Sequence, residues 1–307
     1  MSPEASMSQK IAVIGLGSMG MGAALSLHRA RFAVAGCDLS PDLRARFIEA
    51  GGSASESAIE AAAGASGVVV MVVNAAQTEA VLFGENGAAA VMAKGGVILS
   101  CATMSPDDAR RLANLAESQG LLYLDAPISG GSIKAAAGTI TVMASGSQAA
   151  FAAARPVLLA IAETVYELGD AAGLGAAYKI VNQLLAGVHI AAACEAMTFA
   201  SKLGLDLDSV YKVITASAGN SWMFENRVPH ILDNDYSPRS AIDIFTKDLG
   251  IIAAMGQKEN FPLPVASTAL QLFLATAAAG MGRDDDASVA RMIAQVTGLT
   301  LPQRKTT

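Results

Sequence analysis

IAVIGLGSMG, residues 11–20, decides the fold of this chain. Four apolar residues predict a short strand, the glycines predict a tight turn, and the helix-prone residues 21–30 predict a helix directly after it. The spacing G-x-G-x-x-G is weak evidence alone, but here the strand and the helix that it requires are both present. The exposed N–H groups of such a turn bind phosphates. The sequence therefore predicts a dinucleotide-binding turn formed by Gly15, Leu16, Gly17, Ser18, Met19 and Gly20.

A carboxylate follows the second predicted strand. Residues 32–37 form that strand, and Asp38 comes 18 residues after Gly20 (38 − 20). A carboxylate in this position accepts hydrogen bonds from the adenosine ribose hydroxyls, and its charge repels a 2′-phosphate. NAD is therefore the predicted cofactor, although two arginines follow in the next helix. The alternative role for Asp38 is a helix cap ahead of Pro41.

Strands and helices continue to alternate up to about residue 169. Strands are predicted at 67–73, 96–100, 121–125, 139–145 and 164–168, with helices at 76–82, 106–119 and 148–161. This pattern predicts an α/β fold with a Rossmann-type, doubly wound parallel sheet that binds ligands at the carboxyl ends of its strands. The strand ends at Val73, Asn74 and Thr103 are expected to lie along the cofactor. Ser129-Gly130-Gly131 offers a hydroxyl and backbone N–H groups to a carboxylate, with an ordinary turn as the alternative.

Only helical patterns remain after about residue 169, so an all-α C-terminal domain is predicted. It begins with a long interdomain helix over residues 175–203, which places Lys179, Asn182 and Gln183 on one face. A charge in such an apolar helix is costly unless it has a function. This face is therefore predicted to present an amine and two amides to a ligand, the alternative being a lysine that extends to solvent.

The predicted organisation has three parts. Residues 1–9 lack the basic start and apolar run of a secretion signal and are predicted to be a flexible tail. Residues 10–169 form the NAD-binding domain, and residues 170–307 form a helical domain for substrate binding and oligomerisation. The apolar interdomain helix favours at least a dimer.

Composition argues against several classes of partner. Charged residues make up 16% of the chain and the net charge is −6, with no basic run, so nucleic acid is not expected. The purest apolar run, residues 68–73, is far shorter than the roughly 20 residues of a membrane span. Three scattered cysteines in apolar contexts predict reduced thiols and a cytoplasmic protein. No metal site is predicted, because Asp284, Asp285 and Asp286 directly precede a helix predicted at 287–296, where carboxylates act as caps.

Four motifs together resemble the β-hydroxyacid dehydrogenase family, which includes 3-hydroxyisobutyrate dehydrogenase and tartronate semialdehyde reductase. They are the glycine turn at 15–20, the stretch DAPISGG at 125–131, Gly173-x-Gly175 leading to Lys179-x-x-Asn182-Gln183, and Lys247-Asp248-Leu249. They occur in the family's order and cover nearly the full chain. This chain differs from the family at Ala102-Thr103, where the family usually has Ser-Thr. One hydroxyl near the cofactor is therefore missing.

The resemblance implies roles for individual residues. Lys179 would be the catalytic acid/base, and Thr103 and Lys247 would contact the nicotinamide end of NAD. The residues implied to hold the substrate are Ser129, Gly130, Gly131 and Asn182. Asp248 and Trp222 are further candidates for substrate contact, and core packing is the alternative for Trp222.

Residues 220–227 and 241–248 look most similar to the L-threonate dehydrogenase branch of this family, which oxidises a four-carbon sugar acid to its 2-oxo acid with NAD. The expected partner is thus a small hydroxy acid, and the expected assembly is a homodimer or homotetramer. Oxidation of 3-hydroxyisobutyrate and reduction of tartronate semialdehyde remain alternatives. An imine reductase is disfavoured by Lys179, and a non-catalytic NAD-binding protein is a remote alternative.

Overall fold

The computed structural model describes residues 9–302 and divides into two compact units, which meet in the chain between Lys179 and Ile180. The predicted tail, residues 1–9, lies outside the described residues except for Gln9. Each unit has its own apolar core, so each is described by itself.

A parallel sheet forms the centre of the first unit. Its strand order is β3-β2-β1-β4-β5-β6, and every neighbouring pair is parallel. The register places Ile14, Val70, Ser100 and Asp125 side by side at the carboxyl edge. This order confirms the predicted Rossmann-type fold. The strands are β1 Lys10–Ile14, β2 Ala33–Cys37, β3 Ser53–Ser55, β4 Gly67–Val70, β5 Val97–Ser100 and β6 Leu122–Asp125.

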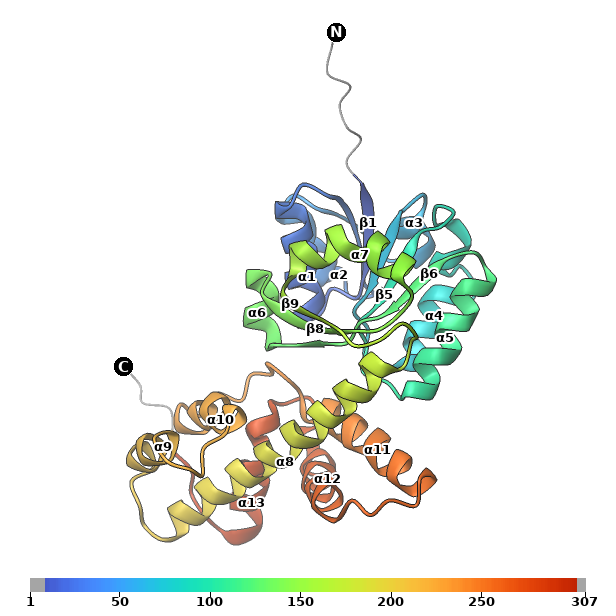
Figure 1. Ribbon diagram of the computed structural model, residues 1–307. Helices are drawn as coiled ribbons and strands as arrows, with labels where there is room; N and C mark the ends of the chain where they lie inside the picture. Colours follow the sequence, from blue (N-terminus) through green and yellow to red (C-terminus); the bar gives the residue numbers. More distant parts are fainter. Residues whose placement is uncertain (1–8, 303–307) are drawn as a thin grey trace. The chain divides into compact units, whose positions relative to one another are not determined.

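Helices cover both faces of this sheet (Figure 1). Successive residues of a strand point to opposite faces, so Ile11 and Val13 are buried in one core and Ala12 and Ile14 in the other. The first core is covered by α1 Ser18–Arg29, α2 Pro41–Glu49, and α7 Gln148–Ile161; the second by α3 Ala58–Ala62, α4 Ala75–Phe83, the 3₁₀ turn η1 Ala88–Val91, and α5 Pro106–Ser118.

The last strands of this unit form a separate, three-stranded sheet. β7 Ile128–Ser129 pairs antiparallel with β8 Ile140–Ala144, which pairs in parallel with β9 Ala162–Glu167. β6 does not continue into this sheet as a ladder, and an isolated bridge joins its last residue, Asp125, to Ser145. Pro127 has no N–H to extend a ladder directly after β6, and the short helix α6 Gly131–Ala137 then intervenes. The sequence pattern did not distinguish this second sheet from the first.

The second unit is helical, which confirms the predicted all-α C-terminal domain. Its core is formed by apolar side chains such as Ile190, Met197, Phe245 and Phe273. The long helix α8 starts one residue before the predicted helix, has the same length of 29 residues, and continues from the first unit into the second. The helices are α8 Leu174–Lys202, α9 Leu207–Thr215, α10 Trp222–Leu232, α11 Ile242–Lys258, α12 Pro264–Thr276 and α13 Val289–Thr297, with the shorter turns η2 Ala277–Met281 and η3 Asp286–Ser288.

Two stretches of the described chain, α8 and Pro264–Met281, are long and apolar enough to span a membrane when judged by length and composition. Both supply core residues to the helical unit, including Met197 and Phe273. A helix that is apolar nearly all round is typical of a protein core as well as of a membrane. Packing in the core therefore accounts for part of their apolar character.

Candidate active site

The glycine turn between β1 and α1 fits a pyrophosphate. Gly15 has φ +93°, and a Cβ there would lie 2.7 Å from the carbonyl oxygen of Met71. A Cβ at Gly17 would meet no atom within 4 Å, so the backbone faces open space at this point. The first turn of α1 carries no acidic residue and no side-chain cap. Its N–H groups and the positive end of the helix dipole are thus left for an anion.

Asp38 lies directly after β2 and is tied to this turn. Its Oδ2 accepts a hydrogen bond from the N–H of Leu16 at 2.7 Å, and its Oδ1 accepts one from the N–H of Ser40 at 2.8 Å. The cap of α2 is Ser40, whose Oγ accepts from the N–H of Leu43, so the helix-cap alternative for Asp38 is excluded. The guanidinium of Arg44 donates to the backbone carbonyls of Asp38 and Leu39, at 2.7 Å and 2.9 Å.

The next two strand ends lie at the same edge of the sheet. β4 ends at Val70, three residues before the predicted end at Val73, so Val73 lies with Asn74 in the connection after the strand. Asn74 caps α4 by accepting the N–H of Gln77 at 2.8 Å, and Val73 is 43% exposed. Thr103 follows β5 and is half-buried, directly after the buried Ala102.

The stretch Ser129-Gly130-Gly131 turns from β7 into α6. Gly130 has φ +129° and Gly131 has φ +73°, conformations that residues with a Cβ rarely adopt. The two consecutive glycines are therefore required by the backbone. Ser129 and Gly130 are half-buried, Gly131 is exposed, and no side chain caps the start of α6.

Lys179 is only 7% exposed, which is contrary to the alternative of a lysine that extends to solvent. The residues on either side of it along α8, Tyr178 and Ile180, are 55% and 6% exposed. Lys179 is thus turned to a protected side of the helix. One turn later, the half-buried Asn182 donates a hydrogen bond from Nδ2 to Oε1 of Gln183 at 2.9 Å.

A hydrogen-bonded chain joins these amides to α11. Gln183 donates from Nε2 to Oδ2 of Asp248 at 2.6 Å, and the other carboxylate oxygen of Asp248 lies 2.6 Å from Nζ of Lys247. Asp248 is fully buried and Gln183 is 7% exposed. The carboxylate therefore holds an amide and an ammonium within the second unit. Gln183 lies four residues after Lys179, and this spacing predicted a shared helix face but not the contact with Asp248.

Trp222, the other candidate in the second unit, is the first residue of α10 and is 56% exposed. Its neighbours Met223 and Phe224 are buried in the core instead. Core packing, the alternative role for Trp222, is therefore excluded. The structure brings Asn182, Gln183, Lys247 and Asp248 together through two hydrogen bonds and an ion pair, whereas Trp222 lies on a different helix.

The three consecutive aspartates have different surroundings. Asp285 caps η3 through the N–H of Ala287 and lies 2.7 Å from Nδ1 of the buried His230. Asp286 pairs with Nε of the buried Arg227 at 2.5 Å, and Asp284 pairs with Arg291 near the surface. The predicted capping role thus applies to Asp285 alone. Among residues 9–302, no group of three or more His, Cys, Asp or Glu side chains is arranged to hold a metal.

Burial and pairing shift the pKa values in this cluster. Burial raises the pKa of Asp286 to about 6, and the attraction of Arg227 opposes that rise. For Asp285, burial alone would raise the pKa, but the hydrogen bond and charge of His230 outweigh it and lower the pKa. The cluster is an internal charge network of the second unit.

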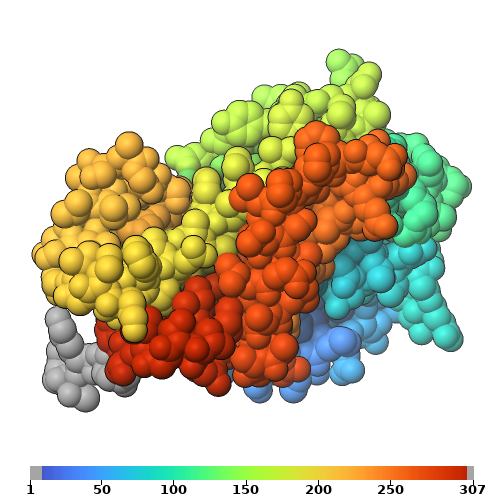
Figure 2. All heavy atoms as spheres, turned by 90° about the horizontal axis from the view of Figure 1, so that it is seen from below, coloured from blue at the N-terminus to red at the C-terminus, as the bar shows by residue number. Residues whose placement is uncertain are grey.

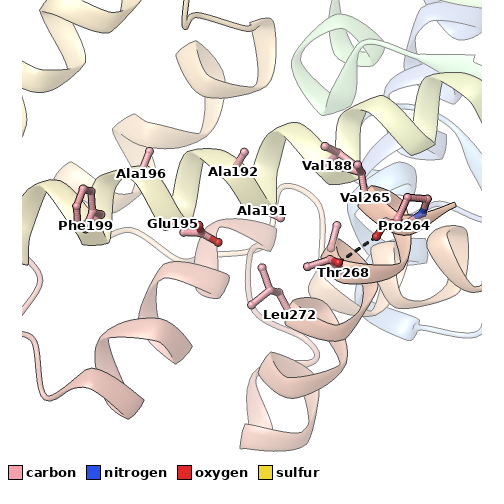
Figure 3. Close-up of a pocket in the computed structure, with 11 residues that line it drawn as sticks. Val188, Ala191, Ala192, Glu195, Ala196, Phe199, Pro264, Val265, Thr268 and Leu272 are labelled. Carbon is pink, nitrogen blue, oxygen red and sulfur yellow. Dashed lines mark hydrogen bonds between the residues drawn. The ribbon is translucent and has the colours of Figure 1, made fainter.

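A groove lies between α8 and α12 on the helical unit (Figures 2 and 3). Figure 3 shows Val188 and Phe199 of α8 on one side and Val265 and Leu272 of α12 on the other. Its lining is apolar except for Glu195 and Thr268, whose hydroxyl donates to the carbonyl of Pro264 at 2.9 Å. None of the predicted site residues lines this groove.

Two family models match the chain. Residues 10–169 match the NAD binding domain of 6-phosphogluconate dehydrogenase, and residues 173–293 match the model described as NAD-binding of NADP-dependent 3-hydroxyisobutyrate dehydrogenase. Together with the glycine turn and Asp38, these matches define the class of the protein as an NAD-dependent oxidoreductase.

Similar proteins specify the family. An L-threonate dehydrogenase of Cupriavidus necator is 52% identical over 296 residues, covering 96% of this chain and 99% of the relative. The Escherichia coli (strain K12) L-threonate dehydrogenase is 48% identical, with coverages of 96% and 97%. A solved 3-hydroxyisobutyrate dehydrogenase from Salmonella typhimurium is 49% identical, with a TM-score of 0.89 and coverages of 93% and 100%. The chain belongs to the 3-hydroxyisobutyrate dehydrogenase-related family of β-hydroxyacid dehydrogenases, and it is an NAD-dependent enzyme that oxidises the CH–OH group of a hydroxy acid.

Proposed function

We propose that this enzyme oxidises L-threonate to its 2-oxo acid, 2-dehydro-L-erythronate. The observation that carries the proposal is the protected Lys179, one turn before Asn182 and Gln183 on α8, in a chain about half identical to L-threonate dehydrogenases over nearly its full length. Residues 10–169 are proposed as the cofactor domain and residues 170–307 as the domain for substrate binding and oligomerisation.

The proposed chemistry assigns a role to each group. NAD supplies the hydride acceptor when it is bound. Lys179 takes the proton from the substrate hydroxyl as the carbonyl forms, and its ammonium returns the proton in the reverse reaction. Ser129, Gly130 and Gly131 bind the substrate carboxylate, while Asn182 orients the substrate. Trp222, which is exposed, is proposed as a further substrate contact.

Most of the proposed cofactor contacts come from residues at the carboxyl edge of the parallel sheet. The glycine turn, residues 15–20, holds the pyrophosphate, and Asp38 binds the adenosine ribose. Val73, Asn74 and Thr103 line the path of the cofactor, and Lys247 contacts its nicotinamide end.

For Asp248 we propose a positioning role. Its carboxylate is fully buried, accepts a hydrogen bond from the Gln183 amide, and forms an ion pair with the Lys247 ammonium. Burial of a charge is costly unless hydrogen bonds and a counter-charge compensate it, and both are supplied here. Asp248 thus orients Lys247 and, through Gln183, the amide of Asn182.

A substrate panel tests the proposed function. We expect NAD reduction with L-threonate at a kcat/KM at least about tenfold above that with 3-hydroxyisobutyrate, a difference of roughly 1.4 kcal/mol in transition-state binding. Initial rates with L-threonate, D-threonate, 3-hydroxyisobutyrate and glycerate give the comparison. Equal or better turnover of 3-hydroxyisobutyrate would remove the threonate assignment and favour the second candidate, which the name of the Salmonella typhimurium relative supports.

Asp38→Asn is expected to reduce the preference for NAD over NADP. Loss of the carboxylate removes charge-assisted hydrogen bonds to the ribose and the repulsion of a 2′-phosphate, so the ratio of the two kcat/KM values should fall about 10- to 100-fold. Glu56→Gln is the matched control, because it removes a different carboxylate, one that pairs with Arg44 and is 70% exposed. An unchanged cofactor ratio in Asp38→Asn would show that Asp38 does not select the cofactor.

We also propose a cytoplasmic homodimer or homotetramer. The exposed Val181 and Leu185 and the groove residues Val188, Ala192 and Phe199 recur every three to seven positions along α8, which places them on one stripe of the helix. Such a stripe is typical of helix–helix contact between subunits. Sedimentation equilibrium measures the assembly, and a monomer at micromolar concentration would contradict this part of the proposal.

A further inference from the structure

A buried carboxylate holds the start of the helix that carries Lys179. Asp125, the last residue of β6, is 1% exposed. Its Oδ2 accepts hydrogen bonds from the N–H groups of Gly173 and Ala176, both at 2.9 Å, and from the hydroxyl of Ser145 at 3.3 Å. Asp125 thus takes up two of the N–H groups that the beginning of a helix leaves without partners.

Ser145 completes the attachment. Its Oγ accepts the N–H of Gly175 at 2.9 Å, and its backbone exchanges two hydrogen bonds with Asp125, at 2.8 Å and 3.0 Å. Two side chains from the ends of two different strands therefore cap α8. All of these groups belong to the first unit.

The close approach of the start of α8 to Asp125 and Ser145 explains why two glycines precede Lys179. Gly173 has φ +103°, and a Cβ there would lie 2.8 Å from Nη1 of Arg110. A Cβ at Gly175 would overlap the carbonyl oxygen of Met143 and lie 3.2 Å from Oδ2 of Asp125. The absence of side chains at Gly173 and Gly175 thus allows the start of α8 to come close enough to the buried carboxylate of Asp125 for hydrogen bonding.

The surroundings of Asp125 act on its charge in two opposite directions, and the pKa is raised overall. Burial raises its pKa, and the hydrogen bonds from Ala176 and Gly173 oppose the rise by stabilising the carboxylate. The positive end of the dipole of the 29-residue helix α8 acts in the same direction as these hydrogen bonds. A neutral side chain would make the attachment weaker.

We propose that Asp125, together with Ser145, is a positioning residue that sets Lys179 relative to the loop Ser129–Gly131. Ala176 precedes Lys179 by three residues, less than one helical turn. The loop begins four residues after Asp125 in the same chain segment. One carboxylate thereby fixes both the acid/base group and the proposed carboxylate-binding loop. The inference rests on the proposed role of Lys179.

Asp125→Asn tests this role, with Ser145→Ala as a second, milder variant. We expect kcat with L-threonate to fall about 10- to 100-fold in Asp125→Asn, the effect of misplacing a reacting group by about 1 Å, while the Kd for NADH stays within about twofold. Asp206→Asn is the matched control, because Asp206 also caps a helix, by accepting the N–H of Ser209 at 2.9 Å, but that helix is α9. It should leave kcat unchanged.

A double-mutant cycle separates positioning from a general loss of structure. In a Lys179→Ala background, Asp125→Asn should lower the residual rate by less than twofold, because its effect acts through Lys179. An equal fold-loss in both backgrounds, or a wild-type kcat in folded Asp125→Asn, would overturn the inference. Full turnover in Lys179→Ala alone would instead overturn the proposed function, so the two failures are distinguishable.

Discussion

Lys179→Ala is expected to lower kcat by about 10²- to 10⁴-fold, the usual contribution of a positioned acid/base group, while NAD still binds. The proposed cofactor contacts lie mainly in the glycine turn and at Asp38, so removing the amine of Lys179 leaves them intact. Steady-state kinetics with L-threonate measure kcat, and fluorescence titration with NADH measures binding.

Lys202→Ala is the matched control for this prediction. Lys202 is an exposed lysine in the last turn of the same helix, so its removal tests for a general effect of losing a positive charge from α8. Its kcat should equal that of the wild type. Turnover by Lys179→Ala within about tenfold of the wild type would be incompatible with the mechanism proposed here.

Asp286→Ala is expected to lower the free energy of unfolding by about 3–5 kcal/mol, the cost of breaking a buried ion pair from one side. The side chains of Asp286 and Arg227 are 0% and 10% exposed, and truncation leaves the guanidinium without its main acceptor. Chemical denaturation at pH 7 measures the change, provided that unfolding is reversible.

The pH of this measurement follows from the pKa of Asp286. Burial raises the folded-state pKa to about 6, above the ordinary value of 3.8 for an aspartate, so the folded state holds the proton more tightly. The contribution of this titration to stability is therefore complete below pH 3.8 and decreases as the pH rises through about 6. At pH 7 the ionised pair is the species being tested.

Asp284→Ala is the control, because it removes the adjacent carboxylate of the same run. Asp284 and Arg291 are each 40% exposed, so this pair should contribute less than about 1 kcal/mol. Equal destabilisation by Asp284→Ala and Asp286→Ala would show that the burial of Asp286 does not determine its contribution.

Local patterns predicted the parts of the fold that depend on neighbouring residues. The apolar run before Gly15 gave β1, and helical spacing located α7 at its observed bounds, residues 148–161. The second sheet was missed because strand propensity does not specify a pairing partner. Its separation depends on Pro127 and on the two-residue strand β7, which is too short to leave a period-2 pattern.

The candidate site was predicted through motifs, but its supporting contacts were not. Asp125 belongs to one of the motifs that the sequence analysis identified. Its carboxylate accepts hydrogen bonds from two backbone N–H groups, 48 and 51 residues further along the chain. Backbone groups leave no signature in a sequence, so these contacts could not be predicted. The pair of Arg227 and Asp286 is likewise 59 residues apart. Asp248 is predicted to contact the substrate from its motif, whereas nothing in the sequence shows that Gln183 and Lys247 contact its carboxylate.

The attachment of α8 to Asp125 has a consequence for recombination between related genes. The two family models are separated only by residues 170–172, which makes this point look suitable for exchanging halves between relatives. An exchange there would take Gly173 and Gly175 from one parent and Asp125 and Ser145 from the other. Chimeras joined at this border should therefore work only when both parents share all four residues, however well each half folds by itself.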